Sequence, residues 1–292
     1  MPSEAIARRL WPGVRPFALL APLLLLMLLF FIWPLLQTLA GSLHPNTPSG
    51  IDVASWTLAN YRRIPDPLYA GILLRTLRIS LIATGITALL AYPVALFVVR
   101  LPPRWEALAI LAYVSPWLVN TLVKALGWTL LLRGSGIVNT LLRQAHLISA
   151  PLRLMLNETG VVIALIPGHF MFVLLPLWAA LRGLDPALGW AAGTLGARPS
   201  AVFWRVTLPL TLPALIAGLV INFVMNMTAF AIPMLLGGER NEVASMLAYR
   251  VNLISLDWPF GGALAVALFA VALLLVWGGQ RLALLAMPGG GR

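Results

Sequence analysis

The segment from Leu184 to Pro213 reads LDPALGWAAGTLGARPSAVFWRVTLPLTLP and interrupts a chain that is otherwise strongly apolar. Asp185 followed by proline is typical of a helix start, because the aspartate accepts hydrogen bonds from free N–H groups and proline fits the first turn. Gly196 allows a tight turn, and Pro199 begins a second helical stretch. The segment therefore predicts a short helix over Pro186–Leu195, a turn, and a second short helix that enters the next apolar run.

Composition places the chain in a membrane. Hydrophobic residues make up 60% of it, charged residues only 10%, and the mean hydropathy is +0.92, whereas a soluble domain carries about a quarter charged residues. The apolar residues come in long runs, which indicates a polytopic all-α membrane protein. The chain has no cysteine, so disulfides and thiolate sites are excluded.

The net charge of +11 raises the question of a nucleic-acid partner. The arginines are scattered over short segments and do not cluster on one polar face, so we expect no nucleic acid. In a membrane protein they are expected to hold helix ends near anionic lipid headgroups.

Six apolar runs approach or exceed the roughly twenty residues needed to cross a bilayer. They are Phe17–Leu39, Leu77–Val99, Leu108–Leu131, Gly160–Leu181, Leu208–Leu235 and Gly262–Leu285. The first run follows Arg8, Arg9 and Arg15 and is too long for the apolar region of a signal peptide, so we expect an uncleaved first span.

We expect a single transmembrane domain over residues 1–292. Residues 1–75 would hold the first span and an outer segment, and residues 76–285 a five-helix core with a loop at 182–207. Six spans place both termini on one side. Arginines divide almost evenly between the two sides, but those before the first span favour a cytoplasmic N-terminus and hence cytoplasmic termini in the inner (plasma) membrane.

Polar side chains inside spans suggest a translocation path, because such groups are costly in a bilayer and often functional. In the third run, helical spacing would put five of them on one face; they are Trp117, Asn120, Thr121, Lys124 and Trp128. In the fifth run, Gly218, Asn222 and Asn226 step by four, with Thr228 nearby. We expect both stripes to line the path.

Other interpretations of these residues stay open. The asparagines and threonine could serve helix–helix hydrogen bonding alone, and Lys124 could reach toward an interface. His169 is a candidate for a proton role or for hydrogen-bonded packing. Lys124 argues against a simple cation funnel, so the substrate could be an anion or a neutral solute, or selectivity could reside in an external binding protein.

The segment quoted first resembles the E-A-A-x3-G-x9-I-x-L-P signature of ATP-binding-cassette (ABC) importer permeases. Its spacing matches throughout, with Trp190 at the Glu position and Val206 at the Ile position. Three softer phrases resemble the spermidine/putrescine-type permeases; they are Trp56–Tyr61, Gly134–Leu141 and Leu256–Ala263. A tryptophan cannot form the ion pair that the family glutamate offers.

The resemblance implies a type I ABC importer permease fold and a loop that binds a separate ATPase. The residues that it assigns to this contact are Asp185, Trp190, Ala191, Ala192, Gly196, Phe203, Val206, Leu208 and Pro209. It also implies two ATPase subunits that hold the ATP, a second permease, identical or sibling, and an extracytoplasmic substrate-binding protein that docks on the outer loops. The implied substrate is a polyamine or a similar small solute.

Two other function classes are weighed against this one. A gradient-driven transporter usually places coupling-ion carboxylates deep in its spans, and we find none in these runs. A membrane-embedded enzyme would show H-E-x-x-H, paired carboxylates or G-x-S-x-G, and these are missing. We therefore expect no catalytic residue, no metal site and no cofactor in this chain, which also lacks a phosphate-binding G-x4-G-K-[S/T] motif.

Overall fold

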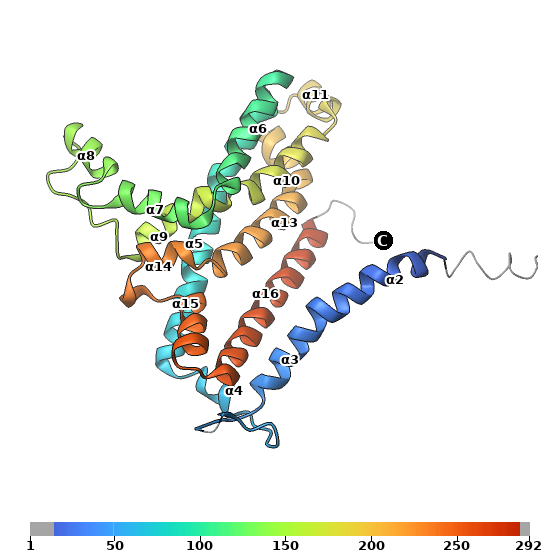
Figure 1. The fold of residues 1–292 in the computed structure, drawn as a ribbon. Coiled ribbons are helices and arrows are strands. Elements are labelled where there is room, and N and C mark those ends of the chain that lie inside the picture. The colour runs from blue at the N-terminus through green and yellow to red at the C-terminus, as the bar shows by residue number, and fades with distance from the viewer. Residues whose placement is uncertain (1–14, 49, 287–292) are drawn as a thin grey trace, which may run out of the picture. The chain divides into compact units, whose positions relative to one another are not determined.

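The computed structural model describes residues 15–48 and 50–286, and almost all of its regular elements are helices (Figure 1). Contacts divide the chain into two compact units. Unit 1 comprises residues 1–64 and 251–267, and unit 2 comprises residues 65–250 and 268–292.

Unit 1 contains one long apolar helix and a compact segment after it. The helix consists of α2 (Arg15–Met27), a π-helical turn η1 (Leu28–Ile32) and α3 (Trp33–Ser42), and its apolar stretch is long enough to cross a membrane. A two-stranded antiparallel hairpin, β1 (Asn46–Thr47) and β2 (Gly50–Ile51), and the short α4 (Ala59–Arg63) follow.

Polar contacts fix this segment within unit 1. The buried Asn60 donates to the carbonyl oxygen of Ser42 at 2.9 Å. Arg63 pairs with Asp257 at 2.7 Å and lies 3.8 Å above the ring of Phe260. The phrases Trp56–Tyr61 and Leu256–Ala263, which are far apart in the sequence, therefore belong to one folded region, because α4 is joined directly to the start of the last helix.

Unit 2 contains the remaining helices. They are α5 (Pro67–Val98), α6 (Pro103–Leu118), α7 (Thr121–Leu132), α8 (Ile137–Gln144), α9 (Glu158–His169), α10 (Met171–Arg182), α11 (Pro186–Thr194), α12 (Pro199–Val202), η2 (Phe203–Thr207), α13 (Leu208–Met227), α14 (Ala231–Leu236), η3 (Glu239–Asn241) and α15 (Ala244–Tyr249). The turn η4 (Arg250–Ile254) and the last helix α16 (Trp258–Ala286) begin in one unit and end in the other.

The expected all-α architecture with six spans is confirmed. Among the described residues, four helices are long and apolar enough to cross a membrane, and two bent helix pairs bring the number to six. The bent pairs are α6 with the α7–α8 segment, at 97°, and α9 with α10, at 43°.

Several details of the predicted spans were wrong. The second span begins at Pro67 instead of Leu77, because the Asp66 carboxylate caps the helix by accepting from the Leu68 N–H at 3.0 Å. The third span is broken after Leu118. The fifth ends at Met227, and the residues that follow form the separate helix α14.

Two apolar clusters hold unit 2 together around α5. The first lies toward the Pro67 end and joins α5 to α7, α9 and α14; its largest fully buried members are Leu132, Leu165 and Leu236. The second lies toward the Val98 end and joins α5 to α10, with partly buried residues from α13. Helix α5 is thus the central element against which the functional segments are positioned.

Candidate functional site

The predicted helix after α10 is confirmed as α11. The side chain of Asp185 accepts a hydrogen bond from the Ala187 N–H at 2.8 Å, and Pro186 occupies the first turn. This is the capping arrangement that the Asp-Pro pair predicts. Helix α11 therefore begins at a fixed point directly after the last residues of α10.

The end of α11 is also fixed by local chemistry. Gly196 has φ +83°, and its N–H donates to the Gly193 carbonyl at 2.9 Å, while the Ala197 N–H donates to the Ala192 carbonyl at 3.0 Å. These two bonds form a Schellman motif, which satisfies the last free carbonyls of the helix and needs a residue in the left-handed region. A glycine six residues after Trp190 is thus required by the backbone.

The second predicted helix is longer than expected. Pro199 begins it, and α12, η2 and α13 continue without a break to Met227 over 29 residues. Val206, Leu208 and Pro209 are half-buried at its start, where Leu208 packs on the second apolar cluster. The coupling loop, residues 182–207, is therefore a pair of helical segments joined by a turn.

Four of the large apolar side chains of the coupling loop are exposed. All nine residues of α11 are described, and none of them is buried. Trp190 is 74% exposed and Leu195 89%, with Leu188 and Trp204 also exposed. Ala191 is exposed and Ala192 half-buried. The loop thus presents large apolar side chains that its own chain does not cover.

Phe203 is among the residues that the resemblance assigns to the ATPase contact, but its surroundings differ from those of Trp190 and Leu195. Its ring is half-buried and meets the ring of Tyr92 on α5 edge to face, with centroids 5.3 Å apart. The physical reason is that η2 already packs onto the second apolar cluster. Trp204, which the sequence analysis did not single out, is the exposed aromatic residue at this place.

The third span does not present the one-sided stripe that we expected. Helix α6 ends at Leu118, Val119 is extended, and α7 starts at Thr121 with the Asn120 side chain accepting from the Leu122 N–H at 2.8 Å. Asparagine is a strong helix N-cap, so the chain turns by 97° at this point. Trp117 and Lys124 therefore lie on different helices.

Lys124 and Trp128 still lie together. Both line a cavity of about 260 Å³ in unit 2, whose other walls come from α6, α9 and α14. The rings of Trp117 and Phe172 meet edge to face, with their centroids 6.2 Å apart. Asn120 and Thr121 are exposed. Their role in a translocation path stays a prediction.

Asn222 and Asn226 are buried in a hydrogen-bond network between helices. The Thr84 hydroxyl donates to Asn222 Oδ1 at 2.9 Å, and Asn226 Nδ2 donates to the same oxygen at 2.9 Å. Asn222 Nδ2 donates to the carbonyl of His169 at 2.8 Å, and His169 Nδ1 lies 2.7 Å from Asn226 Oδ1. The two amides thus join α13 to α5 and to the bend between α9 and α10.

Gly218 belongs to the same face of α13. A Cβ atom at this position would lie 2.8 Å from the Phe172 carbonyl oxygen, so glycine permits the close approach of α13 to α10. Thr228 lies outside this face; it is exposed and bonds only to carbonyls of its own helix. The positions that step by four are therefore packing positions within the chain, and their contact with substrate stays a prediction.

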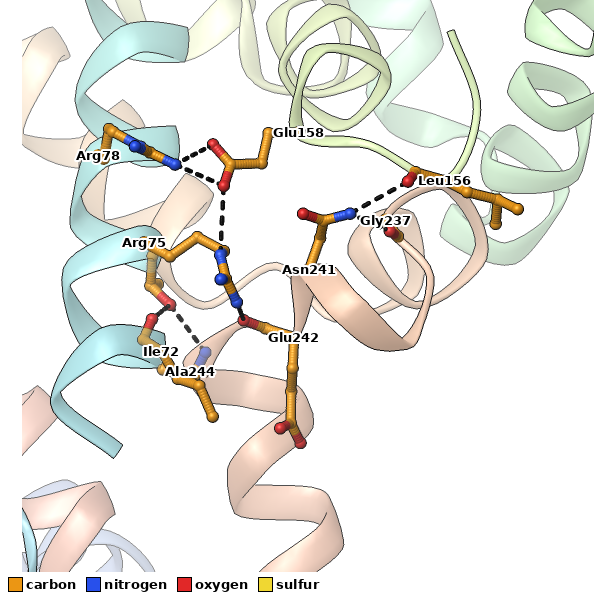
Figure 2. Close-up of polar contacts among 10 residues, drawn as sticks. Ile72, Arg75, Arg78, Leu156, Glu158, Gly237, Asn241, Glu242 and Ala244 are labelled. Carbon is orange, nitrogen blue, oxygen red and sulfur yellow. Dashed lines mark hydrogen bonds and ion pairs between the residues drawn. The ribbon is translucent and has the colours of Figure 1, made fainter. Parts of the chain in front are cut away.

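The sequence analysis missed a polar network at the Pro67 end of α5, which Figure 2 shows. Glu158, at the start of α9, pairs with both Arg75 and Arg78 of α5, and Arg75 also donates to the Glu242 carbonyl at 3.2 Å. The Glu242 carboxylate binds Arg250 through two hydrogen bonds of 2.9 Å, which raise the pKa of Arg250 above its ordinary value. This network fixes the segment after α14 to α5 and α9.

A second missed residue is Glu106, at the start of α6. Its carboxylate is buried and accepts hydrogen bonds from Trp178 and Arg182 of α10, both at 2.8 Å. The available signal was its place in the first turn of a helix that begins with Pro103. Its partners lie more than seventy residues away in the chain, so local pattern did not reveal them.

Comparison with curated proteins identifies close relatives of the whole chain. The spermidine/putrescine transport system permease protein PotB of Haemophilus influenzae is 35% identical over 251 residues, covering 86% of this chain and 88% of the relative. PotB of Escherichia coli K12 is 32% identical over 260 residues, which cover 88% of this chain and 94% of the relative. A putative 2-aminoethylphosphonate transport system permease protein, PhnU of Salmonella typhimurium, is 30% identical and covers 90% of each.

Solved structures share the fold. A bacterial alginate ABC transporter in complex with an alginate pentasaccharide-bound periplasmic protein has a chain with TM-score 0.76 and 18% identity, covering 94% of this chain and 97% of that one. A chain of the MetNI methionine ABC transporter has TM-score 0.57 and 16% identity, and the match covers 76% of this chain and 99% of that one. No protein-family model matches the chain.

Proposed function

This chain belongs to the family of ABC importer permeases that includes the spermidine/putrescine transport system permeases, and from that premise we propose that its coupling loop binds a separate ATPase subunit. The chain is then a transporter subunit with no enzymatic activity of its own, and ATP is bound and hydrolysed by the partner. Closure of the ATPases moves α11, and α10 and α13 carry that movement into the membrane.

The observation that carries this proposal is the exposed surface of α11. A capped helix with no buried residue, bearing Trp190 and followed by Leu195, leaves its large apolar side chains uncovered by its own chain. Exposed apolar patches of this kind mark protein interfaces, and a short helix whose apolar face enters a groove is a recurrent mode of recognition. Where the family glutamate offers an ion pair to the ATPase, Trp190 would instead be buried against it as an apolar side chain.

The remaining partners follow from the same proposal. A second permease, identical or sibling, completes the translocation path, and an extracytoplasmic binding protein delivers the substrate. A solved neighbour bound to a periplasmic protein supports the latter. The chain lies in the inner membrane with both termini cytoplasmic, and lipid surrounds its outward-facing helices.

We propose a polyamine or a similar small amine as the substrate. The named substrates of the relatives, spermidine, putrescine and 2-aminoethylphosphonate, share a primary amine. All nine acidic residues of this chain lie outside the predicted spans. Glu106, which the structure places in the first turn of α6, is bound by Trp178 and Arg182. Charge selection for an amine therefore belongs to the binding protein.

Co-purification tests the proposal. The tagged chain, extracted from its native membrane in mild detergent, should bring a P-loop ATPase in stoichiometric amount, identified by mass spectrometry. Gly196→Val should abolish this association while the six spans remain inserted, because valine is strained at φ +83°. Gly71→Val on α5 is the matched control, since an added Cβ there also meets nothing within 4 Å and the residue lies outside the coupling loop.

Two results would contradict the proposal. One is wild-type transport by Gly196→Val, which would remove the coupling role from this loop. The other is recovery of the chain without an ATPase, together with uptake that persists when ATP is depleted; that outcome would favour a gradient-driven transporter.

A further inference from the structure

Helix α6 packs within unit 2 with a single buried side chain, which is charged. All sixteen of its residues are described, and Glu106 is the only one of them that is buried. Its apolar side chains are exposed or half-buried, with Tyr113 stacked on Phe170 at a centroid distance of 5.5 Å. The one buried side chain of this helix is therefore a charged group, and its apolar contacts, such as that of Tyr113, are only half-buried.

Glu106 uses both oxygens of its carboxylate. Oε1 accepts from Trp178 Nε1 and Oε2 accepts from Arg182 Nη1, each at 2.8 Å. The Glu106 side chain is 6% exposed and that of Arg182 52%. A carboxylate withdrawn from water needs such partners. The pair also joins the first turn of α6 to the last turn of α10, where the two helix dipoles favour a negative and a positive charge respectively.

The Glu106–Arg182 contact lies close in the chain to the start of α11. Arg182 is the last residue of α10, and Asp185, which caps α11, follows after two residues. Figure 1 shows α6 and α10 reaching the end of unit 2 at which α11 lies. A displacement of α11 therefore reaches Arg182 first, and the ion pair passes it to the start of α6.

We propose that Glu106 is a positioning residue that couples movement of the coupling loop to α6. The inference rests on the proposed function, since it takes α11 as the point where the ATPase acts. Through Arg182 and Trp178, Glu106 makes α6 follow the end of α10, so that the movement continues along α6 to the break at Val119 and Asn120.

The alternative is that Glu106 only anchors α6 during folding. The two roles differ in what they predict for a folded transporter. An anchor affects the amount and the thermal stability of the protein, whereas a coupling residue affects how much substrate moves for each ATP hydrolysed. The decisive measurement is therefore this ratio in the assembled complex.

The test uses the complete transporter in proteoliposomes. Glu106→Gln keeps an acceptor for Trp178 and removes the charge that binds Arg182. We expect the ATPase to remain bound and to hydrolyse ATP, while substrate transported per ATP falls about tenfold, within the usual range of coupling between sites. Glu158→Gln is the matched control; it removes a carboxylate with two arginine partners at the other end of α5 and should leave the ratio unchanged.

A second variant keeps the test decisive if Glu106→Gln does not fold. Arg182→Gln removes the half-exposed partner and leaves the hydrogen bond from Trp178 in place. It should lower the same ratio, and the double variant should add little to either single one, as expected for residues that act through one contact.

Spin labels give a direct readout, because the chain has no native cysteine. With Ala187→Cys on α11 and Leu111→Cys on α6, both exposed positions, wild type should show one narrow distance with and without ATP. Glu106→Gln should broaden it. An unchanged ratio and an unchanged distance in a variant that still binds the ATPase would overturn the inference. Loss of the ATPase from wild type would instead overturn the proposed function.

Discussion

Asn226 shows what a single amide does inside this membrane protein. Its Nδ2 donates to Thr84 and to Asn222, and its Oδ1 lies within hydrogen-bond distance of His169. Among the described residues, no buried side-chain nitrogen or oxygen lacks a partner. In a bilayer no water replaces a lost partner, so each member of the network depends on the others.

Asn226→Leu should therefore destabilise the protein by about 1–2 kcal/mol, because Thr84, Asn222 and His169 each lose a partner in a buried site. The measurement is the thermal unfolding midpoint in detergent. Thr228→Val is the control, since that hydroxyl is exposed and bonds only within α13; it should change stability by less than about 0.5 kcal/mol. Equal effects of the two substitutions would contradict the importance of the network.

At the scale of the element, the break between α6 and α7 places Lys124 in the first turn of a new helix. The cavity that it lines with Trp128 also has walls from Pro167 and Ile232. A lysine at this place repels a cationic substrate by about 2 kcal/mol at 8 Å with an effective dielectric constant near 20. If the translocation path passes this cavity, as predicted, we expect Lys124 to disfavour a polyamine relative to an anion.

If the path carries a polyamine past this cavity, Lys124→Met should raise uptake of labelled putrescine severalfold, because it removes this repulsion. Lys124→Arg keeps the charge and should behave as wild type. Reduced putrescine uptake by a folded Lys124→Met variant would contradict this prediction, and a parallel loss of anion uptake would show that the path takes an anionic group.

Sequence predicted those elements whose signals are local. The caps at Asp185 and Gly196 fixed α11 to within one residue of its observed end. The break in the third span was missed because the apolar run continues across Val119, which hides the capping signal of Asn120. Glu106 was missed for a different reason, since its partners come from α10, and only the packed structure brings them together.

For the whole molecule, the described helices agree with the expected count of spans, and the orientation in the membrane follows from the coupling loop. Arginines occur on both sides in nearly equal numbers, so the positive-inside rule decides little. A loop that contacts an ATPase must be cytoplasmic. If this loop contacts an ATPase, as proposed above, six spans place both termini on the cytoplasmic side and residues 40–64 on the other.

Labelling of single cysteines checks this orientation on the cysteine-free chain. Val53→Cys lies in the exposed segment after α3, and Ser200→Cys lies on α12. A membrane-impermeant maleimide added to spheroplasts should label Val53→Cys alone and should label both after permeabilisation. The opposite pattern would invert the topology and remove the coupling loop from the cytoplasm.

The exposed surface of α11 also has a consequence for copies of this chain that are not assembled with partner subunits. Two tryptophans and two leucines are exposed on and beside a helix that has no buried residue, and few buried contacts make a region of low local stability. Such a segment opens readily and exposes backbone to proteases. If the ATPase covers α11 as proposed, we expect the same residues to leave an unassembled copy open to degradation, which would keep the numbers of the subunits matched.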